Sequence, residues 1–266
     1  MVFRAIANEL RSTLPQLAGS PEGRREVGTG AGGDRTVHLD ALAEGIVVRH
    51  LEGAYRSGQR FRLLSEELGS RDFGGSELVL VDPLDGSLNA KLGLPYYSVV
   101  LALAGGDRLR DVRLTLTENL VNGDEFVAAQ GQGALYNGRP ARPVLPSLSG
   151  GRYPVLQLDA PIVKETLERA GPLLERADRI RIMGSAALNI CHAALGGISL
   201  HAAPLPVRAF DLAGPLLFMR ESGGVATDFS GGSVLEAGSG LDSRITLLSS
   251  ASSELHAQAL QLLEAS

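Results

Sequence analysis

The sequence feature that most limits the fold of this chain is a run of short apolar segments separated by turn residues. The strand-like segments are 96–104, 111–117, 124–129 and 133–136, with Gly, Asn or Asp between them. This spacing predicts an antiparallel meander. From residue 155 onward, strand-like and helix-like segments alternate instead. The two patterns predict a layered α/β fold with a strand-rich half over 1–150, an alternating half over 151–266, and a boundary in the Pro-, Gly- and Ser-rich stretch 138–150.

The periodicity and the turn residues of the remaining segments predict further helices and strands. The spacing of apolar residues predicts helices over 2–18, 37–55, 161–177, 185–195, 211–222 and 253–264. Short apolar runs predict strands over 61–64, 77–81, 155–158, 179–183, 198–202, 225–227 and 245–248. The polar, Gly-rich stretch 19–35 is expected to be a mobile loop, and a turn is expected directly after Val81.

Composition excludes several classes of protein. Hydrophobic residues make up 44% of the 266 residues and charged residues 21%, which is typical of a globular chain. The net charge of −5 argues against nucleic acid as the main partner. Cys191 is the single cysteine, so no intrachain disulfide can form, and a reducing, cytoplasmic setting is expected. No apolar run approaches the ~18–20 residues of a membrane span, and the N-terminal residues lack a signal-peptide core.

The segment Val-Asp-Pro-Leu-Asp-Gly-Ser-Leu-Asn, residues 81–89, is the most informative for function. Asp82 and Asp85 lie on one stiff turn around a proline, and two carboxylates held together repel each other unless a cation lies between them. Carboxylate oxygens and the Leu84 carbonyl suit Mg²⁺ or Mn²⁺. The amides of Gly86 and Ser87 at the start of the following helix would point at an anion. The segment therefore predicts a phosphoryl-transfer site, with a surface Asp-Pro turn as the alternative.

Other acids can join this site, although each also has a simpler explanation. Glu66 and Glu67 end a strand sixteen residues before Asp82, and such acid pairs are often merely solvated. Asp211 and Asp40 each lie at the start of a predicted helix, where an aspartate can serve as a cap.

Taken together, these motifs resemble the inositol monophosphatase superfamily, the magnesium-dependent, lithium-sensitive phosphomonoesterases, and most closely its archaeal inositol monophosphatase and fructose-1,6-bisphosphatase branch. The segments that carry the resemblance are GAGGDRTVHLDALAE, SEELG, VDPLDGSLNA, GDEFVAAQGQGALYNGRP, RIMGSAALN and RAFDLAGPLLFMRESGGVATD, between about residues 28 and 228. The resemblance implies a layered αβαβα sandwich of the sugar-phosphatase type.

The resemblance also implies a role for each matching residue. It implies metal ligands at Glu66, Glu67, Asp82, the Leu84 carbonyl, Asp85 and Asp211, with Glu67 near a third, weaker metal. It implies that Asp40 and Ser87 position and deprotonate the attacking water. It implies phosphate contacts from the amides of Gly86 and Ser87, and contacts to the sugar or polyol ring from Ser185 and Ala186.

The implied reaction is hydrolysis of a small sugar or polyol phosphate by direct in-line attack of a metal-activated water, with two or three Mg²⁺ ions per site. The expected partner is this small phosphorylated substrate, with no nucleic acid and no membrane. The family implies a homodimer or a dimer of dimers.

One departure from the family pattern concerns the substrate. Several members carry a polar substrate-reading residue about seven positions before the equivalent of Asp211, where this chain has Pro204. Arg179, Arg181 and Arg208 are candidates to bind a second phosphate, as a bisphosphate requires, but they can equally be solvated surface arginines.

Three alternative functions have less support in the sequence. Residues Gly28–Gly33 match the G-x-G-x-x-G pattern of dinucleotide-binding enzymes, but they follow a polar segment rather than a strand. The Walker A pattern is absent, and neither lysine, Lys91 or Lys164, lies in a Gly-rich loop. A catalytically silent family member acting as a binding or assembly protein is expected to lose a metal carboxylate, and every one is present here.

Overall fold

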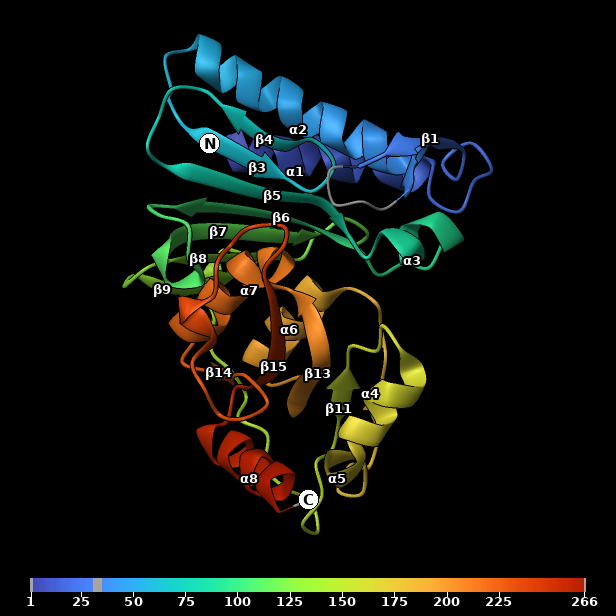
Figure 1. Ribbon diagram of the computed structural model, residues 1–266, viewed down its shortest axis with the longest axis vertical. Helices are drawn as coiled ribbons and strands as arrows, with labels where there is room; N and C mark the ends of the chain where they lie inside the picture. The colour runs from blue at the N-terminus through green and yellow to red at the C-terminus, as the bar shows by residue number, and fades with distance from the viewer. Residues whose placement is uncertain (1, 31–34, 266) are drawn as a thin grey trace.

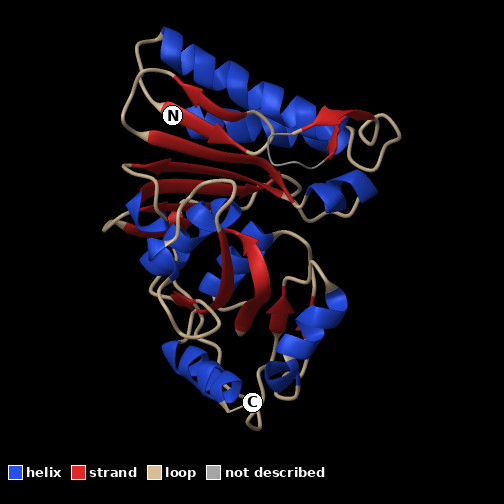
Figure 2. Ribbon diagram, viewed as in Figure 1, coloured by secondary structure: helices blue, strands red, loops and turns tan. Residues whose placement is uncertain are grey.

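The computed structural model describes residues 2–30 and 35–265, and its elements form five layers (Figure 1). The layers alternate helix, sheet, helix, sheet, helix, which confirms the predicted αβαβα sandwich. Figure 2 shows in the same view that the central helices lie between the two sheets. No helix within the described ranges is long and apolar enough to cross a bilayer.

The first sheet and its outer helices come from the N-terminal half of the chain. The outer helices are α1 (Val2–Thr13), followed by the 3-10 turn η1 (Leu14–Gln16), and α2 (His38–Arg56). The eight strands are β3 (Arg62–Ser65), β4 (Gly69–Asp72), β5 (Leu78–Asp85), β6 (Ser98–Ala104), β7 (Val112–Asn119), β8 (Glu125–Ala129), β9 (Gly133–Tyr136) and β10 (Arg139–Pro140). Strands β5 to β9 pair with their neighbours in sequence and antiparallel, which confirms the predicted meander.

The other three layers come from the C-terminal half. The central helices are α6 (Ala186–Ala194) and α7 (Ala209–Glu221). The five strands of the second sheet are β11 (Leu156–Leu158), β12 (Ile180–Arg181), β13 (Leu200–Arg208), β14 (Val225–Thr227) and β15 (Arg244–Ser250). The last layer contains α4 (Val163–Arg169), α5 (Gly171–Leu174) and α8 (Ser253–Glu264).

The central core is shared by the two halves of the chain. Phe126 on β8 packs edge to face against Phe218 on α7, with ring centroids 5.4 Å apart. Leu188 on α6 and Leu247 on β15 lie in the same buried cluster. Because α6 and α7 bury apolar side chains against both sheets, residues of the second half pack directly on the sheet that carries Asp82 and Asp85.

The predicted mobile loop over 19–35 is wrong in part. Strand β1 (Glu26–Thr29) pairs antiparallel with β2 (Arg35–Val37), so a hairpin leads into α2. The two strands are short and lack a regular alternation of apolar residues, which is why periodicity did not reveal them.

The turn predicted directly after Val81 is also wrong, because β5 continues through Asp85. Asp82 pairs with Val100 of β6, and Asp85 pairs with Ser98, so the longer strand bulges between these two positions. Pro83 lies inside the bulge, where a residue without an N–H is tolerated in a strand.

The single helix predicted over 161–177 is two helices, α4 and α5. Pro172 lies in the first turn of α5, where it has no N–H to donate to α4, so the first helix ends before it.

Candidate active site

Asp82 and Asp85 lie at the end of β5, and both side chains are buried, with 3% and 7% of the residue exposed. The amide of Leu84 donates to Asp82 Oδ1 at 3.0 Å, which fixes this carboxylate within the bulge. Gly86 follows with φ of 84° at the start of α3 (Ser87–Leu92). A Cβ at Gly86 would lie 3.0 Å from the Gly184 carbonyl oxygen, so glycine permits the close approach of β5 to the start of α6.

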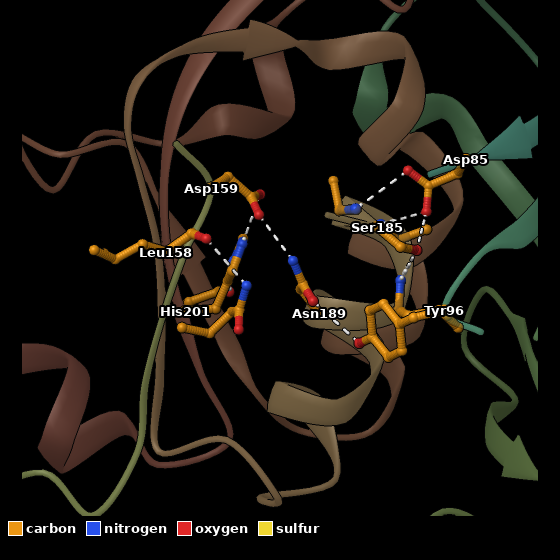
Figure 3. A network of polar contacts seen from close by, with 12 residues as sticks. Asp85, Tyr96, Leu158, Asp159, Ser185, Asn189 and His201 are labelled. Carbon is orange, nitrogen blue, oxygen red and sulfur yellow. Dashed lines mark hydrogen bonds and ion pairs between the residues drawn. The ribbon is translucent and has the colours of Figure 1, made fainter. Parts of the chain in front are cut away.

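Asp85 is held at the N-terminus of α6. Its carboxylate accepts hydrogen bonds from the amides of Ala186 and Ala187, both at 3.2 Å, and from the Ser98 hydroxyl at 3.0 Å. The Ser185 hydroxyl donates to the same carboxylate (Figure 3). Burial raises the pKa of Asp85 to about 6, although these hydrogen bonds act in the opposite direction.

Asp211 lies in the first turn of α7 and is bound by Arg208, which immediately precedes that helix. Arg208 Nε donates to Asp211 Oδ2 at 2.9 Å, and the same guanidinium donates to Glu66. The other oxygen, Asp211 Oδ1, is buried and accepts no hydrogen bond within the described part of the chain. Burial raises the pKa of Asp211 to about 7, and the negative charge of Glu66 adds to this, whereas Arg208 lowers it.

Four carboxylates act on one another across these elements. Burial raises the pKa of Asp82 well above its usual range, and the charges of Glu66, Asp211 and Asp85 raise it further. These acids therefore lie within electrostatic reach of each other in a region of little water, where a cation would relieve their repulsion.

Glu67 is bound by the β1–β2 hairpin. Thr36 Oγ1 donates to Glu67 Oε2 at 2.5 Å. A Cβ at Gly30 would overlap the same carboxylate oxygen, so a glycine here lets the hairpin approach. Burial raises the pKa of Glu67, and the hydrogen bond from Thr36 opposes that shift. The hairpin that the sequence analysis interpreted as a loop thus contributes Thr36 to the site.

Asp40 pairs with Lys91 rather than with Ser87. Lys91 Nζ lies 2.9 Å from Asp40 Oδ2, and the Val37 amide donates to the same oxygen at 3.1 Å. No hydrogen bond joins Asp40 to Ser87, and both residues lie in the described ranges. The bond to Val37 also caps α2, so the helix-capping alternative for Asp40 is present in the structure. Lys91 lies one turn beyond Ser87 on α3.

The donor chemistry of this region fits a hard divalent cation. The acids offer carboxylate oxygens, and Asp211 Oδ1 is buried without a hydrogen bond from the described residues. Over residues 2–30 and 35–265, however, no three His, Cys, Asp or Glu side chains are grouped as a ready metal cage. Arg208 lies between Glu66 and Asp211, so a metal ion would compete with its guanidinium for these two carboxylates.

Comparison with known proteins identifies the family. The chain matches the inositol monophosphatase family over residues 4–266. It belongs to this family. The fructose-1,6-bisphosphatase/inositol-1-monophosphatase of Methanothermobacter thermautotrophicus is 28% identical to it over 97% of this chain and 94% of the relative. The protein of the same name from Thermococcus kodakarensis is 30% identical over 85% of this chain and 82% of the relative.

Solved structures agree with this assignment. A crystal structure of an inositol monophosphatase-fructose 1,6 bisphosphatase has a TM-score of 0.82 to this chain at 26% identity, and the alignment covers 98% of each chain. The Thermotoga maritima inositol monophosphatase shows the same fold, with a TM-score of 0.78 over 98% of this chain and 94% of that chain. The chain is therefore a phosphatase, a hydrolase of the inositol monophosphatase family.

Of the three candidate arginines of this phosphatase, the structure brings only Arg208 to the acids. Arg181 is exposed on β12 and donates to the Ile180 carbonyl at 2.9 Å. Arg179 donates to the Asp178 carbonyl at 2.8 Å. Pro204 is buried on β13 and supplies no polar side-chain group.

A polar network that the sequence analysis missed lies behind the start of α6 (Figure 3). Asn189 accepts from the Tyr96 hydroxyl at 3.0 Å and donates to Asp159 Oδ1 at 2.8 Å. His201 Nε2 lies 2.9 Å from Asp159 Oδ2. Asn189 follows Ser185 by four residues and so shares its face of α6, which is the signal that could have revealed it. The charge of Asp159 acts on Asp85, so the network contributes to the electrostatics of the site.

Glu44 is a second residue that the sequence analysis missed. Its buried carboxylate accepts from the Ser65 hydroxyl at 2.7 Å, and its other oxygen, Oε1, is buried without a hydrogen bond from the described residues. Burial raises its pKa, and the hydrogen bond from Ser65 and the nearby backbone of Glu67 and Leu68 oppose the shift. Glu44 lies four residues after Asp40 on the same face of α2. It therefore holds the turn that presents Glu66 and Glu67.

The structure gives no support to the dinucleotide-binding hypothesis. Gly28 and Gly30 lie in and just after β1, a short exposed strand that pairs antiparallel with β2, whereas the motif requires a parallel β-α-β unit. Residues 31–33 of the same motif lie outside the described residues.

Proposed function

We propose that this phosphatase hydrolyses a phosphomonoester of a small sugar or polyol, namely inositol monophosphate, fructose-1,6-bisphosphate or both, and that it requires Mg²⁺, with Mn²⁺ as a possible substitute. The observation that carries the proposal is a cluster of acids: Asp82 and Asp85 are buried, Glu66 and Asp211 both bind the guanidinium of Arg208, and the charges of Glu66, Asp211 and Asp85 raise the pKa of Asp82. Two relatives with the double name fructose-1,6-bisphosphatase/inositol-1-monophosphatase support the choice of substrates.

The proposed ligands of the first two metal ions are Glu66, Asp82, the Leu84 carbonyl, Asp85 and Asp211, and Glu67 belongs to the position of a third, weaker ion. When bound, the ions would stabilise charge on the phosphate and the leaving oxygen and make water a better nucleophile. An ion bound by Glu66 and Asp211 would compete with the hydrogen bonds that these carboxylates accept from Arg208. Asp85 is kept in place by Ser185 and the Ala186 amide, so these two residues fix a ligand as well as lie near the polyol ring.

Asp40 and Ser87 are proposed to orient the attacking water on opposite sides. Asp40 is buried and keeps its position through Val37 and Lys91, so it can accept a hydrogen bond from a water without reorienting. The amides of Gly86 and Ser87 face the proposed phosphate position at the start of α3. In-line attack then expels the sugar or polyol oxygen.

The choice between the two substrates depends on positively charged side chains. Arg208 contacts carboxylates, and Arg181 is exposed, so neither is held ready for a second phosphate. Pro204 offers no hydrogen bond to an inositol hydroxyl. The ratio of the rates of phosphate release from the two substrates therefore shows which lack limits activity more: that of a cation held ready for a second phosphate, or that of a hydrogen bond to an inositol hydroxyl.

The experiment measures phosphate release by purified protein with Mg²⁺ from myo-inositol 1-phosphate and from fructose-1,6-bisphosphate, with and without EDTA. Asp82→Asn and Asp211→Asn should each lower kcat by at least about 100-fold, since each removes a ligand charge. Asp178→Asn, an exposed carboxylate in an ion pair with Arg152, is the matched control and should keep wild-type activity. Release that survives EDTA, or full activity in both site variants, would refute the metal assignment.

Three further properties belong to the same proposal. They are lithium inhibition, a homodimer or dimer of dimers, and a cytoplasmic location. A LiCl titration of phosphate release, size-exclusion chromatography with light scattering, and cell fractionation test them in turn.

A role in binding or assembly remains the second candidate, because relatives from Pasteurella multocida and Xylella fastidiosa carry the name Nus factor SuhB, at 28% and 31% identity. The complete set of acids favours catalysis. Absence of both phosphate release and Mg²⁺ binding would favour this second candidate instead.

A further inference from the structure

Lys91 is a lysine that the phosphatase places inside its candidate active site. Its Nζ lies 2.9 Å from Asp40 Oδ2, and the two side chains are 22% and 5% exposed. Glu67 lies beside this pair, because its carboxylate accepts from the Thr36 hydroxyl, and the next residue, Val37, donates its amide to the same Asp40 oxygen that Lys91 contacts. The lysine therefore lies near two acids that belong to α2 and to the turn after β3.

The remaining groups around these two acids are hydrogen-bonded within the protein. Asp40 also accepts from the Val37 amide, and Glu67 accepts from the Thr36 hydroxyl. Arg208 binds a different pair of acids, because its guanidinium donates to Glu66 and Asp211.

The acids of the site thus form two sets with different surroundings. The first set, Asp40 and Glu67, has the ammonium group of Lys91 beside it. The second set comprises Asp82 and Asp85, which are buried, and Asp211, whose oxygen Oδ1 is buried without a hydrogen bond from the described residues. An ammonium is a compact point charge that repels a divalent cation at distances of a few ångströms.

We propose that Lys91 is a built-in cation of the active site, which takes the place of a metal ion beside Asp40 and Glu67 and confines metal binding to the acids around Asp82. This inference rests on the proposed function. Lys91 also acts as a positioning residue, because its ammonium fixes the orientation of Asp40. The phosphatase should accordingly bind two divalent ions per chain, and removal of the Lys91 charge should open a further site.

The test is a count of Mn²⁺ ions bound to metal-free protein, measured by calorimetry and by the loss of the free Mn²⁺ signal in electron paramagnetic resonance. Lys91→Met removes the charge and keeps most of the stem, and Lys91→Gln removes the charge but keeps a hydrogen-bond donor for Asp40. Lys91→Arg retains the charge. Lys164→Met removes an exposed lysine of α4 and is the matched control.

We expect two ions per chain for the wild type, Lys91→Arg and Lys164→Met, and one additional ion for Lys91→Gln and Lys91→Met. The additional ion should bind at least about tenfold more weakly than the first two, because it depends on only two carboxylates. If Lys91→Met fails to fold, judged by its thermal transition, Lys91→Gln alone decides the result.

The outcomes separate this inference from the function on which it rests. Three ions in the wild type, or two in both charge-removing variants, would overturn the role of Lys91 and leave the metal-dependent phosphatase intact. No Mn²⁺ bound to the wild type, together with no phosphate release, would overturn the proposed function and the inference together.

Discussion

At the scale of single residues, the acids of the candidate site lower the stability of the metal-free protein. Asp82, Asp85 and Asp211 are buried near one another, and burial raises the pKa of each of them. A raised pKa means that the ionised carboxylate is disfavoured in the folded state relative to the unfolded chain. Arg208 offsets only part of this repulsion, through Asp211 and Glu66.

The metal-free protein should therefore lose stability as the pH rises. An aspartate in the unfolded chain titrates near ~3.9, whereas Asp85 and Asp211 titrate at about 6 and about 7 in the fold. Between these values the folded state holds more protons, so the free energy of unfolding falls from about pH 4 to about pH 7. Asp211→Asn should flatten this slope and raise the free energy of unfolding at pH 7 by roughly 1–3 kcal/mol.

Thermal unfolding in EDTA across this pH range measures the effect, with Asp178→Asn as the control. If the free energy of unfolding of Asp211→Asn fell with pH as steeply as that of the wild type, the raised pKa assigned to Asp211 would be contradicted. The same variant should lose activity, so stability and catalysis respond in opposite directions to one substitution.

The residues of the site were predictable from sequence to different degrees. The sequence motifs and the family resemblance named the acids because strand ends and helix starts are local features. Arg208 was named as a candidate to bind phosphate, but its contact with Glu66 across 142 positions and that of Lys91 with Asp40 across 51 were not predictable. Such pairs depend on how distant elements pack, and no local pattern encodes them.

At the scale of elements, the turn between β3 and β4 depends on a buried glutamate of α2. Glu44 accepts a hydrogen bond at 2.7 Å from Ser65, the last residue of β3 before that turn. Ser65 also donates to the Val81 carbonyl, next to Asp82. The two segments that carry proposed metal ligands are thus both linked to α2 through the Ser65 hydroxyl.

Glu44→Ala should destabilise the protein by about 1–3 kcal/mol, because the buried Ser65 hydroxyl loses this acceptor. It should also weaken Mn²⁺ binding by roughly 10–100-fold, as loss of a group that orients metal ligands does. Chemical denaturation and Mn²⁺ titration measure the two effects. Glu52→Ala, a half-exposed residue on the same helix, should change neither by a comparable amount, and an equal loss there would contradict the role of Glu44.

The predicted boundaries of strands were wrong where the strands contain prolines. Strand β13 extends over Leu200–Arg208, although the apolar pattern predicted only 198–202. Pro204 and Pro206 lie where its register with β15 is irregular, between Ala203 and Val207. The lack of an N–H is tolerated at such a place, but a sequence pattern alone treats proline as the end of a strand.

At the scale of the whole molecule, α7 fixes the distance between the two sheets. A Cβ at Gly214 would lie 2.9 Å from Val100 Cγ1 and would overlap the Thr115 hydroxyl, so this helix packs directly on β6 and β7. Asp211 lies one turn earlier on the same helix. The spacing of the layers and the position of a proposed metal ligand are therefore linked.

Gly214→Ala should destabilise the protein by roughly 1–3 kcal/mol through overpacking, and it should weaken Mn²⁺ binding because α7 must shift. Gly45→Ala in α2 is the matched control, since a Cβ there meets no atom within 4 Å. That control should be neutral or stabilising by about 0.5–1 kcal/mol. Wild-type denaturation midpoints and Mn²⁺ affinity in Gly214→Ala would contradict this account of the packing.

The order of layers was predictable as a whole, because the family resemblance implies it and the change from a meander to alternating segments agrees with it. The spacing between layers was not, since it depends on which side chains meet. Gly214 looks like an ordinary helix-weakening residue in the sequence, and only its neighbours on β6 and β7 explain it.

The assembly of the site from both halves of the chain has a consequence during translation. The acids appear in the order Asp40, Glu66, Asp82 and Asp211, and α7, which carries the last of them, forms the central layer. A nascent chain whose first sheet has already emerged from the ribosome still lacks that layer, so the inner face of the sheet remains uncovered and the set of proposed metal ligands is incomplete. An interrupted synthesis product would accordingly be inert toward phosphate esters and a client for chaperones, and hydrolytic capacity would arise only once the polypeptide is nearly finished.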